Sequence, residues 1–250
     1  MSEVFVTALL ELADDHLVLG HRLSEWCGHA PMLEEDLALP NMALDLIGAA
    51  RGLYAYAGSI EGNGRGEDDL AYLRGEREYL NCLLVERENG DFAQTMLRQL
   101  YFAGFMEPYW QAAMASRDET LRGIAAKAVK EVAYHIRHAA EWVVRLGDGT
   151  EESARHMAEA VEELHRFTDE LFLSSPAAAA AEAAGLLPAR AEMRGAWEAT
   201  LRAVFAEARL DWPDAVWPQK GGREGAHGEG LGHLLAEMQS LHRAHPGAVW

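Results

Sequence analysis

Residues 119–147 read ETLRGIAAKAVKEVAYHIRHAAEWVVRLG, and their apolar side chains recur at intervals of three and four. This spacing puts them on one face of an α-helix. Ser116-Arg117-Asp118-Glu119 has the spacing of a capping box, and Gly147 suits a helix C-terminus. We therefore predict a long helix whose inward face carries Leu121, Ala125, Ala128, Val132, His135, Ala139, Trp142 and Leu146.

The same helical period continues along most of the chain, and no strand pattern interrupts it. Residues 33–59 are apolar on most sides, as expected of a buried helix, whereas 212–230 are rich in Pro, Trp and Gly. We expect an all-α, ferritin-like four-helix bundle with additional helices and a non-helical C-terminal strap. It would form one domain, 1–250, with its core bundle at about 4–173 and the additional helices and strap at about 174–250. The other predicted helices cover about 4–27, 33–59, 68–85, 92–115, 151–173, 188–209 and 230–244.

Composition indicates an ordinary soluble protein. The 250 residues are 49% hydrophobic, enough for one large core. No run approaches the ~18 apolar residues of a membrane span, and the N-terminus lacks a signal-peptide pattern, so we expect a cytoplasmic protein. Cys27 and Cys82 form no metal-type pair and are interpreted as reduced thiols. The formal net charge of -18 disfavours nucleic acids and anionic membranes as partners.

Helix bundles can hold two irons, but this sequence lacks the required spacing. In such sites two helices give one Glu each, and two others each give a Glu-x-x-His pair. Glu131 and His135 are four apart, and Val132 stands where the three-apart Glu is needed. In the second predicted helix Asp45 is followed by Gly48 rather than His, and 92–106 contain no acidic residue. We therefore expect no metal, no cofactor and no catalytic site in this chain.

Four residues remain candidates for a vestigial site or for buried polar pairs: His16, Asp45, Glu131 and His135. Both histidines fall inside apolar stripes, where an imidazole needs a hydrogen bond. For His135 the simplest interpretation is a polar pair with Glu131, extended by Lys127 into a ladder at intervals of four. A remnant of a metal site is the alternative.

Three further patterns predict no chemistry. Glu162 and His165 have the spacing of a ligand pair, but they should point towards solvent. Glu224 and His227 have it too, but in a Gly-rich loop without helical pitch. Residues 219–224 lack the Gly-Lys-Ser/Thr order of a phosphate loop, so we expect a surface connection.

Several blocks in order resemble one known family. They are Leu23 to Pro31, the Asp36 to Arg51 helix, Lys127 to His135, the tail Gly232 to Gln239, and the ending Pro246 to Trp250. Together they resemble the PaaC-type, non-catalytic subunits of phenylacetyl-CoA epoxidase over essentially the whole chain.

The resemblance implies a cytoplasmic, ferritin-like structural subunit of a bacterial oxygenase that epoxidises the ring of phenylacetyl-CoA in aerobic phenylacetate degradation. A related di-iron catalytic subunit would be its partner, and a reductase with flavin and iron–sulfur groups would supply electrons from NADPH. Leu46, Ala103 and Val132 are departures from the metal-binding pattern. The alternatives are an acidic all-α adaptor for another partner and a self-standing metal-dependent oxidase.

Overall fold

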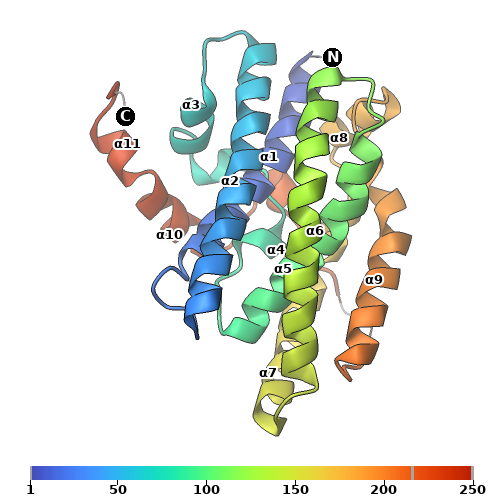
Figure 1. The fold of residues 1–250 in the computed structure, drawn as a ribbon. Coiled ribbons are helices and arrows are strands. Elements are labelled where there is room, and N and C mark those ends of the chain that lie inside the picture. The colour runs from blue at the N-terminus through green and yellow to red at the C-terminus, as the bar shows by residue number, and fades with distance from the viewer. Residues whose placement is uncertain (1, 215–216, 249–250) are drawn as a thin grey trace. The chain divides into compact units, whose positions relative to one another are not determined.

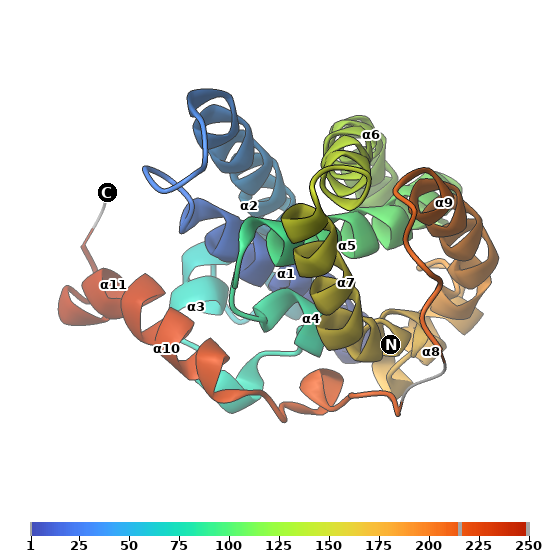
Figure 2. The same cartoon turned by 90° about the horizontal axis from the view of Figure 1, so that it is seen from below.

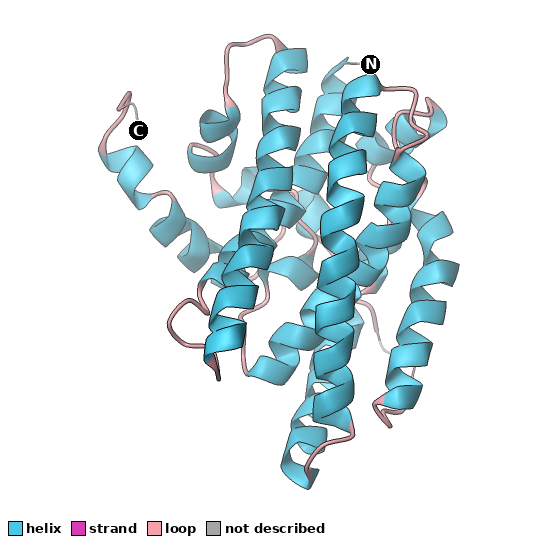
Figure 3. Ribbon diagram, in the orientation of Figure 1, coloured by secondary structure: helices cyan, strands magenta, loops and turns pink. Residues whose placement is uncertain are grey.

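The computed structural model describes residues 2–214 and 217–248. This part of the chain consists of helices joined by turns and loops, with no strand (Figure 3), as the sequence predicts. It divides into two compact units. Unit 1 takes Met1–Glu88 and Gly221–Trp250, and unit 2 takes Asn89–Lys220. The single domain expected from sequence stays a prediction. Four residues of the predicted strap and ending lie outside the described residues: Ala215, Val216, Val249 and Trp250.

Unit 1 is built on a pair of long helices. α1 (Ser2–Ser24) and α2 (Leu33–Glu61) lie side by side (Figure 1). A Cβ at Gly20 would lie 2.8 Å from Cγ1 of Ile47, so glycine permits the close approach of the two helices. α2 ends at Gly62, which takes the left-handed conformation (φ 71°) and donates its N–H to the carbonyl of Gly58.

The first helix is shorter than predicted, and the third is not one helix. α1 stops at Ser24 because residues 25–30 form turns through Gly28 at φ 79°. The predicted helix 68–85 is wrong. The chain forms α3 (Glu67–Tyr72), a 3₁₀ turn (Glu76–Glu78) and α4 (Leu83–Glu86) instead.

The C-terminal part of unit 1 is a short 3₁₀ turn, Gly222–Glu224, followed by α10 (Glu229–Met238) and α11 (Ser240–Ala244). The predicted helix 230–244 is therefore interrupted at Gln239. The amide of Gln239 is buried and donates to the carbonyls of Ala71 and Arg74. These bonds hold the junction of α10 and α11 against the end of α3, and Figure 2 shows α10 and α11 beside α3.

Unit 2 contains α5 (Phe92–Ala113), α6 (Glu119–Gly147) and α7 (Glu151–Leu164), with α5 packed on both others. Asp118, not Ser116, caps α6, because its carboxylate accepts the N–H of Leu121. Ser116 instead donates its hydroxyl to the carbonyl of Leu186. The predicted start of α6 is therefore right, but its capping residue is wrong.

The inward face of α6 follows the prediction for five turns and then shifts. Its buried residues include His135 and Ala139, as predicted, but then Val143 and Gly147 in place of Trp142 and Leu146. The 3.6-residue period drifts around the helix axis over this length, so a strict alternation of three and four does not persist.

After α7 the chain leaves the α-helix earlier than predicted, through 3₁₀ turns at His165–Phe167 and Asp169–Phe172. α8 (Pro176–Ala183), a 3₁₀ turn (Arg190–Met193) and α9 (Arg194–Glu207) complete unit 2. Trp197 on α9 is buried and donates its indole N–H to the carbonyl of Tyr101 at 2.9 Å. In the part of the chain that the structure describes, no helix has the length and hydrophobicity needed to cross a membrane.

Candidate functional site

The four candidate residues divide between the two units. In unit 1, His16 on α1 is buried and its Nδ1 donates to the carbonyl of Leu12 at 2.7 Å, while Asp45 on α2 is half-buried. In unit 2, His135 on α6 is buried and Glu131 is half-buried.

One step of the predicted polar ladder is a defined contact. Glu131 lies 3.4 Å from the ammonium of Lys127, whose side chain is 68% exposed. Over residues 2–214 and 217–248, no group of three or more His, Cys, Asp or Glu side chains is placed to hold a metal ion.

Unit 1 contains a buried polar network that the sequence reasoning missed. Asp14 on α1 is fully buried, and both its carboxylate oxygens are engaged. One accepts the hydroxyl of Tyr54 and an Nη of Arg74, and the other accepts Nη1 of Arg74 at 3.0 Å and the N–H of Leu80 at 2.7 Å. Arg74 binds the carboxylate in the bidentate geometry that guanidinium groups favour.

Burial and charge act together on these groups. Burial, and then the negative charge of Asp14, raise the pKa of Tyr54 well above its ordinary value, so the phenol stays neutral. Burial alone would lower the pKa of Arg74, but the charge of Asp14, the neighbouring Tyr54 and the hydrogen bond to Asp14 together raise it. The pair is therefore a salt bridge in the interior of unit 1.

Asp15 forms a second buried salt bridge, with Arg223. Its Oδ2 accepts Nη2 of Arg223 at 2.6 Å, and its Oδ1 accepts Nη1 at 3.0 Å and the N–H of Cys82 at 2.7 Å. The same Nη1 donates to the carbonyls of Glu11 and Leu80, at 3.1 and 2.9 Å. Burial opposes the charge of Arg223, but Asp15 raises its pKa above the ordinary value.

The Gly-rich segment is therefore not the surface connection predicted from sequence. Within residues 219–224, Gly222 and Arg223 are buried. The prediction was wrong because its Arg reaches a carboxylate some two hundred positions earlier in the chain, which no local pattern reveals.

These carboxylates also explain why the predicted helix 68–85 is broken. In a helix, the N–H groups of Leu80 and Cys82 would bond carbonyls four residues earlier. Here they donate to Asp14 and Asp15 instead. The segment is thus bound to α1 through its backbone as well as its side chains.

His227 connects the C-terminal segment of unit 1 to Glu86 and to the backbone of Tyr79. Its Nδ1 lies 2.7 Å from Oε2 of Glu86 and its Nε2 lies 2.8 Å from the carbonyl of Tyr79. The carbonyl of Tyr79 can only accept, and a protonated imidazole can donate to it and to the Glu86 carboxylate at once. Burial would lower the pKa of His227, but the hydrogen bonds to Glu86 and to Tyr79 raise it above 6.5. The remaining contacts of the Glu86 carboxylate are with Asn81 at 2.9 Å and the N–H of Gly228 at 2.7 Å.

The structure places the two Glu-x-x-His motifs, Glu162 to His165 and Glu224 to His227, in different surroundings. Glu224 is exposed and lies in the 3₁₀ turn Gly222–Glu224 rather than in the predicted loop, and the imidazole of His227 has no exposed surface. Glu162 is exposed, as predicted, whereas His165 is half-buried against Tyr101 and Trp197, with ring centroids 5.9 and 6.4 Å away. Burial lowers the pKa of His165, so this imidazole is neutral.

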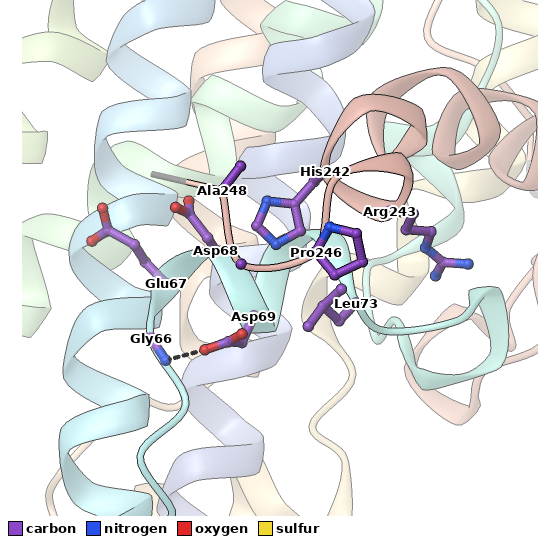
Figure 4. Close-up of a pocket in the computed structure, with 10 residues that line it drawn as sticks. Gly66, Glu67, Asp68, Asp69, Leu73, His242, Arg243, Pro246 and Ala248 are labelled. Atoms are coloured by element: carbon purple, nitrogen blue, oxygen red, sulfur yellow. Dashed lines mark hydrogen bonds between the residues drawn. The ribbon is translucent and has the colours of Figure 1, made fainter. Parts of the chain in front are cut away.

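A pocket of about 480 Å³ opens between the start of α3 and the C-terminal end of unit 1 (Figure 4). Its acidic side includes Asp68 and Asp69, and its other side includes His242 and Arg243. Asp69 accepts the N–H of Gly66 at 2.7 Å, and Arg243 donates to the carbonyls of Tyr72 and Arg74. The bond of Asp69 thus caps α3, and the bonds of Arg243 hold α11 against the segment that follows α3.

Comparison with known proteins agrees with the resemblance found in the sequence. The model of the family described as "Phenylacetic acid catabolic protein" matches residues 2–250. The chain belongs to this family. It is 46% identical over 241 residues to the C subunit of 1,2-phenylacetyl-CoA epoxidase from Escherichia coli (strain K12), covering 96% of this chain and 97% of that protein. The family predicted from the sequence is confirmed.

In this member of the phenylacetic acid catabolic proteins, the buried polar network has a structural role. We call its residues the buried joint: Asp14, Asp15, Tyr54, Arg74, Glu86, Arg223 and His227. Both oxygens of Asp14, Asp15 and Glu86 accept hydrogen bonds from the protein itself. Carboxylates with this many internal donors have little capacity left for a ligand. What they do is bind residues 74–86 and 221–230 to α1.

One sequence signal pointed to this joint. Asp14 and Asp15 stand, with Glu11 and His16, in the mostly apolar run ALLELADDHLVLG at residues 8–20. Acidic side chains inside a helix that is apolar on nearly every side must be paired. The arginines that pair with them could not be identified from spacing.

Proposed function

We propose that this chain is the non-catalytic structural subunit of a phenylacetyl-CoA epoxidase. In that role it pairs with a di-iron catalytic subunit and supports it, while the assembled enzyme epoxidises the aromatic ring of phenylacetyl-CoA. The observation that carries the proposal is the 46% identity, over nearly the full length of both chains, to a protein named as a subunit of this epoxidase.

The residues at the positions that depart from the metal-binding pattern are consistent with a supporting role. Leu46, Ala103 and Val132 are buried and apolar, at 4%, 1% and 6% exposure. Iron in such bundles requires carboxylates and imidazoles to balance its charge and fill its coordination sphere. Side chains of this kind cannot supply them, so His135 remains as the single plausible remnant.

The partners follow from the same proposal. The di-iron centre belongs to the catalytic subunit, and flavin, iron–sulfur groups and NADPH chemistry belong to a reductase subunit. This chain binds none of these cofactors. The complex works in the cytoplasm, without nucleic acid or membrane.

A subunit without a catalytic site contributes through rigidity. A catalytic bundle must hold its reacting groups in position and limit the access of water. Two buried salt bridges, at Asp14 and Asp15, stabilise the interior of this chain. Its surface should therefore keep its conformation when the catalytic subunit packs against it.

Reconstitution tests the proposal. The catalytic subunit and the reductase are assayed for NADPH-dependent epoxide formation with increasing amounts of this chain. We expect turnover to rise and saturate at a fixed ratio of the two subunits. Equal turnover without this chain, or turnover by this chain and the reductase alone, would contradict the proposal.

A further inference from the structure

One face of α2 remains exposed although it is apolar. Leu33, Leu37 and Leu44 are 70%, 60% and 66% exposed, and Met32 beside them is 46% exposed. We call these four residues the leucine patch. The sequence predicts that this helix is buried on most sides, and the structure corrects that expectation for this face. The buried side of the same helix carries Leu39, Met42, Leu46 and Leu53.

The three leucines form one continuous surface rather than scattered positions. At about 100° per residue, their side chains fall within an arc of about 40° on the helix. They extend over about 17 Å, from the first turn to the fourth. Single exposed leucines are common on proteins, but a row of them on one helix face is typical of an interaction surface.

The charges around the patch select the kind of partner. Residues 23–50 contain Glu25, Glu34, Glu35, Asp36 and Asp45, and no Lys or Arg. Glu34 is exposed, Glu25 is exposed but pairs with Arg22 at 2.8 Å, and Glu35 is buried. In a two-fold dimer of this chain the patch would meet itself, and these acids would face their own copies. With a net charge of -18 on each chain, this arrangement is repulsive.

We infer that the leucine patch docks a helix of the di-iron catalytic subunit whose apolar ridge is flanked by Lys or Arg side chains. The inference rests on the proposed function, because it takes the partner from that proposal. Apolar packing of the leucines supplies affinity, and the acidic rim steers the basic flanks during encounter. The patch lies wholly within unit 1.

The experiment compares leucines inside and outside the patch. Leu37→Glu and Leu44→Glu place a charge on the docking face, while Leu73→Glu and Leu241→Glu alter leucines that are 52% and 57% exposed elsewhere in unit 1. Binding of each purified full-length variant to the purified catalytic subunit is measured by biolayer interferometry. Because all four side chains are exposed, circular dichroism should show wild-type melting curves.

We expect each patch variant to raise Kd at least about tenfold, a change of about 1.4 kcal/mol. The two control variants should stay within about twofold of the wild type. Wild-type binding with unchanged Kd in the patch variants would overturn the leucine patch and leave the proposed function standing. No binding of the wild type to the catalytic subunit would overturn both.

Two further readouts test the chosen partner. Sedimentation of the wild-type chain alone should show a monomer, and a dimer that Leu37→Glu dissociates would assign the patch to a second copy. Glu34→Lys should slow association with the catalytic subunit and weaken its dependence on salt. An unchanged association rate would refute the inference that Lys or Arg side chains flank the apolar ridge of the partner helix.

Discussion

Replacing Arg223 with Met tests the buried joint directly. The substitution keeps a long side chain in the Gly-rich segment but removes the positive charge. Asp15, which is fully buried, then keeps its hydrogen bond from the N–H of Cys82 at 2.7 Å and loses both of its bonds to the guanidinium. The carbonyls of Glu11 and Leu80 lose a donor as well.

The expected cost follows from this count. Removing one partner of a buried ion pair destabilises a protein by about 3–5 kcal/mol, because the other charge is left uncompensated. The remaining hydrogen bond to Asp15 reduces this figure, so we expect the free energy of unfolding to fall by about 3 kcal/mol. Arg155→Met is the matched control. Its pair with Glu159 is more than half exposed on both sides, so it should change stability by less than about 0.5 kcal/mol.

Urea unfolding followed by circular dichroism gives the free energy, and limited proteolysis reports on residues 221–230. Arg223→Met should lower the urea midpoint and expose this segment to cleavage. If Asp15→Asn is combined with Arg223→Met, the loss should be smaller than the sum of the two single losses, since the uncompensated charge is gone. A loss below about 1 kcal/mol for Arg223→Met would refute the view that this salt bridge holds the segment.

Three further substitutions probe the same joint. His227→Gln removes a histidine whose folded pKa lies above its ordinary value of 6.5, so its stabilising charge is fully present below about pH 6.5 and is lost as pH rises through the folded pKa. The variant should therefore lose more free energy of unfolding at pH 6 than at pH 9. Equal losses at the two pH values would contradict this. Gly222→Ala should lower the free energy of unfolding by about 1–3 kcal/mol, because the new Cβ would lie 2.1 Å from the backbone oxygen of Asn81. In the control Gly123→Ala, the new Cβ meets open space on a helix, so the free energy of unfolding should rise by about 0.5–1 kcal/mol. Tyr54→Phe leaves a buried carboxylate short of one donor and should cost about 1–3 kcal/mol by thermal unfolding; no loss would mean that the hydroxyl is replaceable.

Regular helices were predictable from the sequence because their burial repeats along the chain. α5 and α6 end within two residues of their predicted limits, since the helical period of their apolar residues is a local signal. The absence of a Glu-x-x-His pair on α6 is local as well, because it depends only on positions 131–135.

The joint was not predictable in this way. Its pairs connect Asp14 with Arg74 and Asp15 with Arg223, at separations of 60 and 208 positions. Charged residues in Gly-rich or short amphipathic segments are ordinarily solvated, so the pattern favoured the surface for Arg223. Only the fold reveals that these arginines neutralise two acids inside an apolar helix.

The exposed face of α2 escaped prediction for a related reason. Sequence periodicity distinguishes apolar from polar faces, but Leu33, Leu37 and Leu44 are as apolar as the residues that are buried against α1. Whether an apolar face packs within its own chain or against a partner depends on how many neighbours the fold provides, which periodicity does not encode.

Iron content measures the non-catalytic role most directly. The full chain is expressed alone in iron-replete medium, purified, and assayed for iron by elemental analysis alongside the catalytic subunit prepared in the same way. For a supporting subunit we predict iron near zero in this folded, helical chain and about two irons in the catalytic subunit. About two irons in this chain would contradict the proposed role, and would mean that His16, Asp45, Glu131 and His135 belong to a working metal site.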